Sequence, residues 1–404
     1  MLYVKTPDEA LRIINDVFSD GLPGEFIHIS DASGRILAAD ITAEEYVPDF
    51  NRSTVDGYAL KASETFGSSD SIPAILPLAG EIKMGDAAPS SLASGTCMSV
   101  PTGGEVPEGA DSVVMLEYVE NYGDGTIGVT KPVAPGENII YRGDDVKPGD
   151  LLLDLGHRLR PHDIGALAAL GISRAFVRTR PVVGIISTGD ELVDCAETPQ
   201  IGQIRDVNSL LLSSAVEQMG CISKSYGIIR DDDALLEAAA VRAVSECDIV
   251  LISGGSSVGE KDATARVIAS KGQILFHGIA MQPGKPTILG IINEKPVFGL
   301  PGHPVAAHFV CQLFLRPLMA RRQGTAYRAH TISARLGIAL SSNHGRAEYI
   351  GVRIEDASEL PTAHPVHGKS GLITSLSGTD GFICIPRDCE GLPKSAAVTV
   401  TLWD

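Results

Sequence analysis

Five short segments in the second half of the chain carry side chains that can bind phosphate or a metal ion. They are STGDEL (187–192), GQIRDVN (202–208), RDDD (230–233), SGGSSVGEKD (253–262) and GLPGHP (299–304). Four of them contain acids, namely Asp190, Glu191, Asp206, Asp231 and Asp262. Carboxylates suit Mg2+, which can bridge phosphate oxygens. The alternative is that each acid only caps a helix. The cation site is therefore predicted from the set, with Asp262 as the best single candidate.

The segment that begins at Ser253 follows an apolar run, DIVLI (248–252), and continues through Gly254, Gly255 and Ser256. Exposed N–H groups in a glycine-rich turn after a buried strand can hold an anion. No Gly-Lys-Ser/Thr follows at the spacing of a Walker phosphate loop. We interpret the segment as a phosphate-binding loop whose neighbouring acids recruit a cation, which offsets the negative charge of both ligand and protein.

Other candidates have an ordinary structural alternative. Lys285 lies between two prolines in QPGKP (282–286), where it either binds an anion or is a solvated turn lysine. The turns that hold Asp56 with Tyr58, and Thr102, are also explained by turn chemistry alone. His364 and His367 have no evident third metal ligand, and no Ser-His-Asp arrangement can be identified.

Composition excludes several classes of protein. The 404 residues carry a formal net charge of -17, which argues against binding nucleic acid or an anionic membrane surface. No apolar run approaches the roughly 20 residues of a membrane span. The first residues, MLYVKTPDEA, do not resemble an export signal. Seven cysteines without a Cys-x-x-Cys pair favour reduced thiols in a cytoplasmic protein.

The pattern of elements predicts a multidomain protein of α/β plus β class. Residues 6–21 should form a helix with Thr6 as its cap and Glu9 completing a capping box. Residues 25–156 show short β-like runs, and 161–171 a helix. From about 180 to 324, apolar strands alternate with helices, which predicts a parallel sheet covered on both faces, with its loops converging in one crevice. Short strands after 324 predict a small all-β domain.

Further motifs extend over nearly the full chain. They are SGRILAADI (33–41), RSTVDGYA (52–59), PTGGEVPEGAD (101–111), GENIIYRGDD (136–145) and SGLITSLSGTDGF (370–382). With STGDEL, SGGSSVG, QPGKP and GLPGHP, in this order, they resemble the molybdopterin molybdenumtransferases, the MoeA family, which includes the C-terminal domain of gephyrin.

The resemblance implies an elongated homodimer of several domains. It assigns 1–26 to an N-terminal helix of the dimer scaffold, 27–45 and 145–176 to a small split linker domain, and 46–144 to a β-rich domain. It assigns 177–324 to a central α/β molybdopterin-binding domain with a parallel sheet, and 325–404 to a C-terminal β-barrel. The implied reaction inserts molybdate into adenylylated molybdopterin with release of AMP, assisted by Mg2+. The dithiolene sulfurs of the substrate would bind molybdenum, which agrees with the lack of a cysteine cluster.

The resemblance also implies the site residues. The functional positions would be Asp56, Thr102, Glu191, Asp231, Asp262 and Lys285, with Glu191 and Asp262 as metal ligands. The substrate would be bound by Arg142, Asp145, Ser187, Thr188, Gly189, Asp190, Ser253, Gly254, Gly255, Ser256, Gln282, Pro301 and Gly302, and by Ser370 and Ser375 from the barrel of the partner subunit.

Two positions depart from the family pattern. Gln282 stands where several relatives have Lys, and His303 where several have Asn. Gln282 removes a possible oxyanion contact, which bears on how molybdate is held and on preference over tungstate.

Two other functions remain open on the sequence. The chain could be a molybdopterin-binding scaffold, as gephyrin binds receptors, although the acids and Lys285 are all present. It could be a molybdopterin adenylyltransferase or nucleotide hydrolase that uses the α/β domain alone, which leaves the preceding residues and the barrel unexplained. The adenylyltransferase of the same pathway is also a candidate partner.

Overall fold

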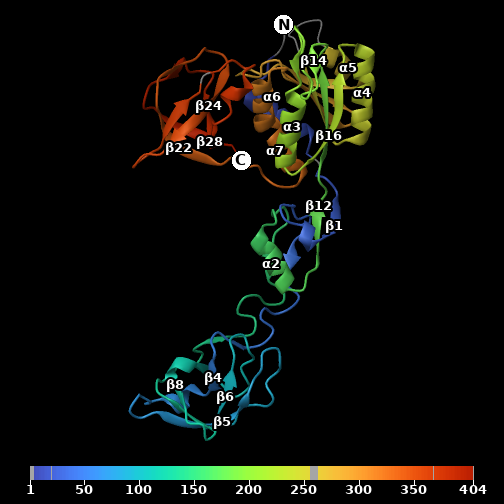
Figure 1. The fold of residues 1–404 in the computed structure, drawn as a ribbon. Coiled ribbons are helices and arrows are strands. Elements are labelled where there is room, and N and C mark those ends of the chain that lie inside the picture. Colours follow the sequence, from blue (N-terminus) through green and yellow to red (C-terminus); the bar gives the residue numbers. More distant parts are fainter. Residues whose placement is uncertain (1–3, 20, 255–262, 367, 404) are drawn as a thin grey trace.

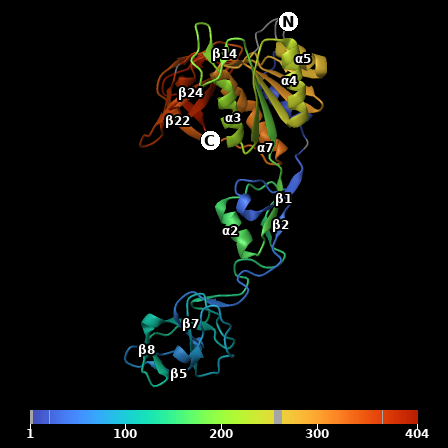
Figure 2. The ribbon, with the colours of Figure 1, turned by 45° about the vertical axis from the view of Figure 1, so that its right-hand side comes forward.

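The computed structural model describes residues 4–19, 21–254, 263–366 and 368–403. The chain is elongated: a β-rich unit lies at one end, a narrow middle unit follows, and an α/β unit and a barrel lie side by side at the other end (Figures 1 and 2). Among the described residues, no helix combines the length and apolar character needed to cross a bilayer.

The chain enters and leaves the middle unit through three antiparallel strand pairs. These are β1 (Gly24–His28) with β12 (Arg174–Arg178), β2 (Ile41–Thr42) with β11 (Leu151–Leu153), and β3 (Arg52–Ser53) with β10 (Ile139–Ile140). The predicted helix is present as α2 (Pro161–Ala169). Leu167 of α2 packs with Leu37, Leu159 and Val177 in a small core. The β-rich unit is therefore an insertion carried at the far end of these paired strands.

The β-rich unit is one six-stranded sheet in the order β7-β4-β6-β5-β9-β8. Its strands are β4 (Gly57–Leu60), β5 (Ala74–Glu81), β6 (Cys97–Val100), β7 (Ser112–Met115), β8 (Val119–Asn121) and β9 (Thr126–Val129). Successive side chains of a strand point to opposite faces. Accordingly Leu60 and Val114 lie in one core, and Ala59 and Val113 in another.

The α/β unit contains a six-stranded sheet in the order β16-β13-β17-β21-β20-β18. Its strands are β13 (Val182–Thr188), β16 (Ile222–Ile229), β17 (Ile249–Ser253), β18 (Gln273–His277), β20 (Ile288–Ile292) and β21 (Lys295–Leu300). The predicted parallel sheet is present in β16, β13, β17 and β21, and β20 departs from it by pairing antiparallel with both neighbours. The reason is the two-residue turn Asn293–Glu294, whose φ angles of 49° and 64° suit a tight hairpin between β20 and β21.

Helices cover both faces of this sheet, as predicted. One face packs against α1 (Pro7–Val17), α3 (Asn208–Gln218), α6 (Pro304–Val310), the π-helical turn Cys311–Leu315 and α7 (Arg316–Arg322). The other packs against α4 (Asp233–Glu246) and α5 (Ala263–Lys271). The capping box of α1 is confirmed, because the N–H of Glu9 donates to Thr6 Oγ1 at 3.2 Å and the N–H of Thr6 to Glu9 Oε2 at 2.7 Å.

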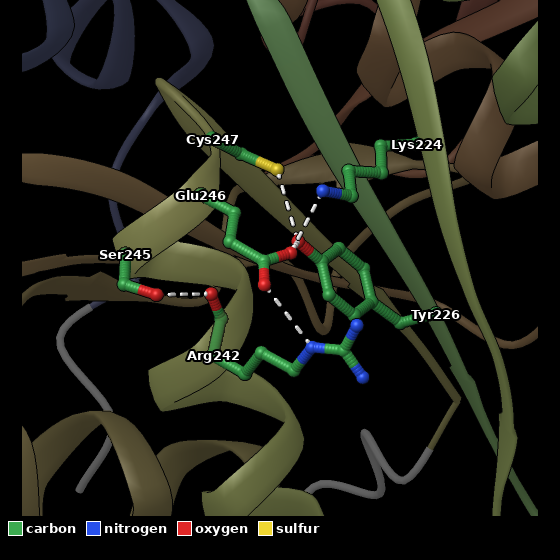
Figure 3. A network of polar contacts seen from close by, with 6 residues as sticks. All are labelled: Lys224, Tyr226, Arg242, Ser245, Glu246 and Cys247. Atoms are coloured by element: carbon green, nitrogen blue, oxygen red, sulfur yellow. Dashed lines mark hydrogen bonds and ion pairs between the residues drawn. The ribbon is translucent and has the colours of Figure 1, made fainter.

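The end of α4 is fixed to the edge strand β16 by a polar network (Figure 3). Glu246 accepts from Tyr226 Oη at 2.7 Å and pairs with Lys224 Nζ at 2.8 Å and Arg242 Nε at 3.2 Å. Hydrogen bonds from Lys224, Tyr226 and Arg242 lower the pKa of Glu246 to about 2. We interpret this network as structural, since these contacts join a helix end to a sheet edge.

The predicted C-terminal barrel is present. It contains β22 (Thr331–Leu336), β23 (Leu340–Ser341), β24 (Ala347–Glu355), β25 (Thr362–Pro365), β26 (Gly381–Ile385), β27 (Gly391–Leu392) and β28 (Ala397–Leu402). The sheet closes because β24 pairs with both β25 and β26. A short strand of the α/β unit, β19 (Met281–Gln282), pairs in parallel with β24 and joins the two units.

Candidate functional site

The loops at the carboxyl edge of the α/β sheet lie in direct contact. Thr188, the last residue of β13, donates through Oγ1 to Asp231 Oδ1 at 2.9 Å. The N–H of Asp231 in turn reaches Asp190 Oδ1 at 3.3 Å. The N–H of Gly254 donates to the carbonyl of Leu300 at 3.4 Å. Four of the five predicted segments thus meet in one place, as the strand pattern predicted.

Glycine allows these loops to approach one another. Gly254 has a φ of +101°, and a Cβ at this position would lie 2.0 Å from the carbonyl oxygen of Thr188. A Cβ on Gly302 would lie 3.8 Å from Gly254 Cα. A Cβ on Gly189 would lie 2.9 Å from both carboxylate oxygens of Glu191. The Glu191 side chain therefore folds back over the loop that carries it.

The remaining segment is attached through Asn208, which the sequence interpretation did not single out. Asn208 is 8% exposed, and its Nδ2 donates to Ser253 Oγ at 2.6 Å and to the carbonyl of Gly302 at 2.9 Å. Among the residues that the structure describes, its Oδ1 and the hydroxyl of Ser187 are buried without a hydrogen-bond partner. Asn208 therefore connects the start of the phosphate-loop segment to the GLPGHP segment.

The acids of this edge have different roles. Asp190, Glu191 and Asp231 are exposed. Asp206 is 6% exposed, and its Oδ1 accepts the N–H of Ser209 at 3.1 Å. This contact with the first turn of α3 and the burial of Asp206 favour the structural alternative for this acid, and its place in the cation set stays a prediction.

The described residues alone form no group of three or more His, Cys, Asp or Glu side chains able to hold a metal ion. Gly255, Ser256 and Asp262 lie outside the described residues. The pair Glu191 and Asp262 as metal ligands therefore stays a prediction.

A cavity of about 690 Å³ lies between the α/β unit and the barrel. From the α/β unit it is lined by Gln282, Lys285, Pro301 and His303, and from the barrel by Arg346, Glu348, Lys369, Ser370 and Ser375, among others. Glu348 accepts from Ser342 Oγ at 2.6 Å. The described lining thus carries three cationic side chains, Lys285, Arg346 and Lys369, and one acid, which suits an anion.

The barrel serines reach this cavity within one chain. Ser370 Oγ lies 2.7 Å from His303 Nδ1, and the carbonyl of Ser370 accepts the N–H of Val305 at 3.2 Å. The expectation that Ser370 and Ser375 come from a partner's barrel is wrong for this cavity, because the pairing of β19 with β24 already holds the chain's own barrel there.

Arg346 and Lys369 were missed by sequence reasoning. Each is a lone basic residue near a strand or turn of the barrel, a position that usually indicates only a solvated surface. Nothing in their local spacing distinguishes them. Their placement depends on how the barrel docks against the α/β unit.

The candidates of the β-rich unit, and Asp145 directly after it, lie apart from both places (Figure 1). Asp56 and Thr102 are neighbours, since the N–H of Thr102 donates to Asp56 Oδ1 at 2.7 Å. Arg142 is exposed, pairs with Asp49 at 3.1 Å and lies over the Tyr46 ring at 4.2 Å. Asp145 is also exposed. One chain alone does not bring these four residues to the cavity.

The remaining candidate is the histidine pair of the barrel. His364 Nε2 lies 2.7 Å from Glu355 Oε2, which describes a hydrogen bond between the neighbouring strands β25 and β24. His367 lies outside the described residues.

Three family models match successive parts of the chain. They are the MoeA N-terminal region (domain I and II) over residues 5–171, a probable molybdopterin binding domain over 184–321, and the MoeA C-terminal region (domain IV) over 333–403.

Similar proteins match most or all of the chain. The molybdopterin molybdenumtransferase of Haemophilus influenzae is 37% identical over 74% of this chain and 73% of its own. That of Bacillus subtilis is 30% identical over 100% and 95%, respectively. The crystal structure of the MoeA molybdopterin biosynthesis protein of Pyrococcus horikoshii matches with a TM-score of 0.86 and 37% identity, over 99% of each chain. The chain therefore belongs to the MoeA family.

Proposed function

We propose that this protein is a molybdopterin molybdenumtransferase, which inserts molybdate into adenylylated molybdopterin and releases AMP. The single observation that supports it most is the position of the GLPGHP segment. On one side Gly302 lies beside Gly254 of the phosphate-loop segment. On the other side Pro301 and His303 line the cationic cavity. One substrate bound along this segment would present its phosphates and its dithiolene to adjacent sites.

The two sites would divide the work. The carboxyl edge would bind the pyrophosphate through the amides that follow Ser253, and the cavity would bind the molybdate dianion. Lys285 brings full charge to that anion, and Gln282 brings a neutral amide. A hydrogen bond from either side chain to the anion is charge-assisted, and only Lys285 adds the attraction between two opposite charges. We therefore assign Lys285 the larger contribution to oxyanion binding.

The acids of the carboxyl edge fit a divalent cation. Glu191 and Asp231 are exposed and carry oxygen ligands of the kind that Mg2+ prefers. Glu191 and Asp262 would hold the ion, and the ion would neutralise charge on the pyrophosphate when bound.

Comparing two lysine variants tests this assignment. Lys285→Ala should lower molybdate-dependent AMP release by at least about tenfold, since a charge-assisted contact is worth roughly 1.5–3 kcal/mol. Lys271→Ala is the matched control, because this lysine lies on α5 and pairs with Glu237 at 2.7 Å. Such a surface pair contributes little. Equal activity of the two variants would refute the role of Lys285.

We also propose that the protein acts as a cytoplasmic homodimer with a composite site. Asp56, Thr102 and Arg142 belong to the β-rich unit and Asp145 follows directly on it, so a second chain would have to bring them to the cavity. Mixing Asp56→Ala and Lys285→Ala chains should restore activity, because some mixed dimers hold one site with both residues intact. A mixture no more active than either variant would contradict the composite site.

A further inference from the structure

The turn that carries Gln282 and Lys285 is held between two segments that are distant in sequence. On one side the N–H of Lys5 donates to the carbonyl of Gly278 at 3.1 Å, and the N–H of Ala280 donates to the carbonyl of Lys5 at 2.7 Å. On the other side the N–H of Ala347 in β24 donates to the carbonyl of Ala280 at 2.9 Å. Residues 279–282 thus lie between the N-terminal segment and β24: Ile279 forms an isolated parallel bridge with Lys5, and β19 pairs with β24.

The bridge residue Ile279 and its neighbour Gly278 are directly connected to the segment that holds Lys285. The N–H of Ile279 donates to the carbonyl of Lys285 at 2.9 Å, and the N–H of Gly278 donates to the carbonyl of Thr287 at 2.8 Å. Ile279 and Thr287 are each 0% exposed. A shift of the main chain at Ile279 would therefore move the main chain of Lys285 as well.

The N-terminal segment is itself firmly anchored. Thr6 and Glu9 form the capping box immediately after Lys5. Ala10 and Ile14 of the following helix α1, and Phe18 directly after it, are buried in the core of the α/β unit. The main chain of Lys5 therefore has a fixed position from which to hold the turn.

We propose that the main chain of Lys5 is a positioning element for Lys285, which sets where this cation stands in the oxyanion cavity. The proposal rests on the function proposed above for Lys285. It assigns a role in molybdate binding to a segment that does not line the cavity. The role belongs to the N–H and carbonyl of Lys5, and its side chain has no part in it.

Two variants separate the main chain from the side chain. Lys5→Pro removes the N–H that donates to Gly278. Lys5→Ala keeps both main-chain groups and removes only the charged side chain. Sodium molybdate and AMP are each titrated against the full-length variants. Lys5→Pro should weaken molybdate binding about three- to tenfold, the range that one main-chain hydrogen bond supports. Lys5→Ala should bind molybdate like the parent, and AMP affinity should be unchanged in both.

Two results would overturn the proposal: a folded Lys5→Pro variant with the parent's molybdate affinity, or equal weakening of molybdate and AMP. A parallel titration of Lys285→Ala tests the proposed function separately. If this variant keeps molybdate affinity, the assignment of Lys285 fails. If it loses affinity while Lys5→Pro does not, only the positioning role fails.

Amide hydrogen exchange on the unmodified protein decides the matter should Lys5→Pro not fold. Coupling between two sites is reciprocal. Saturating molybdate should therefore slow exchange at the amides of Lys5 and Ala280. Unchanged protection at both amides would refute the coupling.

Discussion

Gly254→Ala should separate the two strands whose ends form the phosphate site. The new Cβ would lie 2.0 Å from the carbonyl oxygen of Thr188, whereas real Cβ contacts are essentially never shorter than 3.0 Å. The loop must therefore move by at least about 1 Å. A misplacement of this size can cost about 100-fold in rate. The φ of +101° adds strain of roughly 1–2 kcal/mol for any residue with a Cβ.

Gly165→Ala is the matched control. Gly165 lies within α2, and a Cβ there would meet nothing within 4 Å. Alanine in a helix interior is favoured over glycine by about 1 kcal/mol. This variant should melt slightly higher than the parent and keep full activity.

The assay combines AMP titration, molybdate titration and thermal melting. Gly254→Ala should lose most AMP affinity and nearly all turnover, while molybdate affinity stays near that of the parent because the cavity lies across the GLPGHP segment. If AMP affinity and turnover remain at the parent's level in Gly254→Ala, the close approach of Gly254 and Thr188 does not matter for the site.

Four further predictions test other parts of the molecule. Asn208→Asp replaces the donor to Ser253 Oγ and Gly302 O with a buried carboxylate. AMP binding should weaken at least about tenfold, and molybdate binding should not change. An AMP affinity equal to that of the parent would remove Asn208 from the site. Asp262→Ala should abolish Mg2+-dependent AMP release without lowering the melting temperature, whereas unchanged turnover at saturating Mg2+ would reassign Asp262 to a helix cap. Gln282→Lys should tighten molybdate binding and make it more salt-dependent. If variant and parent have the same molybdate affinity and the same salt dependence, Gln282 lies outside the oxyanion site and only satisfies backbone groups of its own turn. Burial, with a smaller effect of Arg316, lowers the pKa of His308 from 6.5 to about 4. Protonation therefore favours the unfolded state, and the free energy of unfolding should fall by at most about 3 kcal/mol as the pH drops from 6.5 to 4. His308→Phe should flatten this pH dependence, and a variant whose melting temperature has the same pH profile as the parent's would refute it.

Short sequence patterns predicted the elements that are stabilised by interactions between residues close in sequence. The capping box at Thr6 and Glu9 needs only four neighbouring residues, and the apolar run before Ser253 is long enough to identify a buried strand. The same strands place their following loops at one edge, so the contacts among Thr188, Asp231 and Gly254 could be expected in outline from the strand pattern.

Features that depend on tertiary contacts were not predictable in the same way. The direction of β20 depends on the Asn293–Glu294 turn, whose sequence lacks the Asn-Gly signal of a tight hairpin. Asn208 looks like an ordinary residue at the start of a helix, and its partners lie 45 and 94 residues away. The cavity exists because β19 pairs with β24. No local pattern indicates that pairing, so Arg346 and Lys369 could not be assigned.

The alternative functions predict different chemistry from the same chain. A scaffold would bind adenylyl-molybdopterin without turnover. An adenylyltransferase would produce adenylyl-molybdopterin from ATP without inserting molybdate. Neither explains why three cations of two different units line one cavity beside the GLPGHP segment.

Mass analysis of the reaction products tests the central claim most directly. The purified protein is incubated with adenylyl-molybdopterin, molybdate and Mg2+, with a parallel reaction that lacks molybdate. We predict AMP together with a pterin that has gained molybdenum, and neither product in the reaction without molybdate. Recovery of intact adenylyl-molybdopterin, or release of AMP without incorporation of molybdenum, would contradict the proposed function.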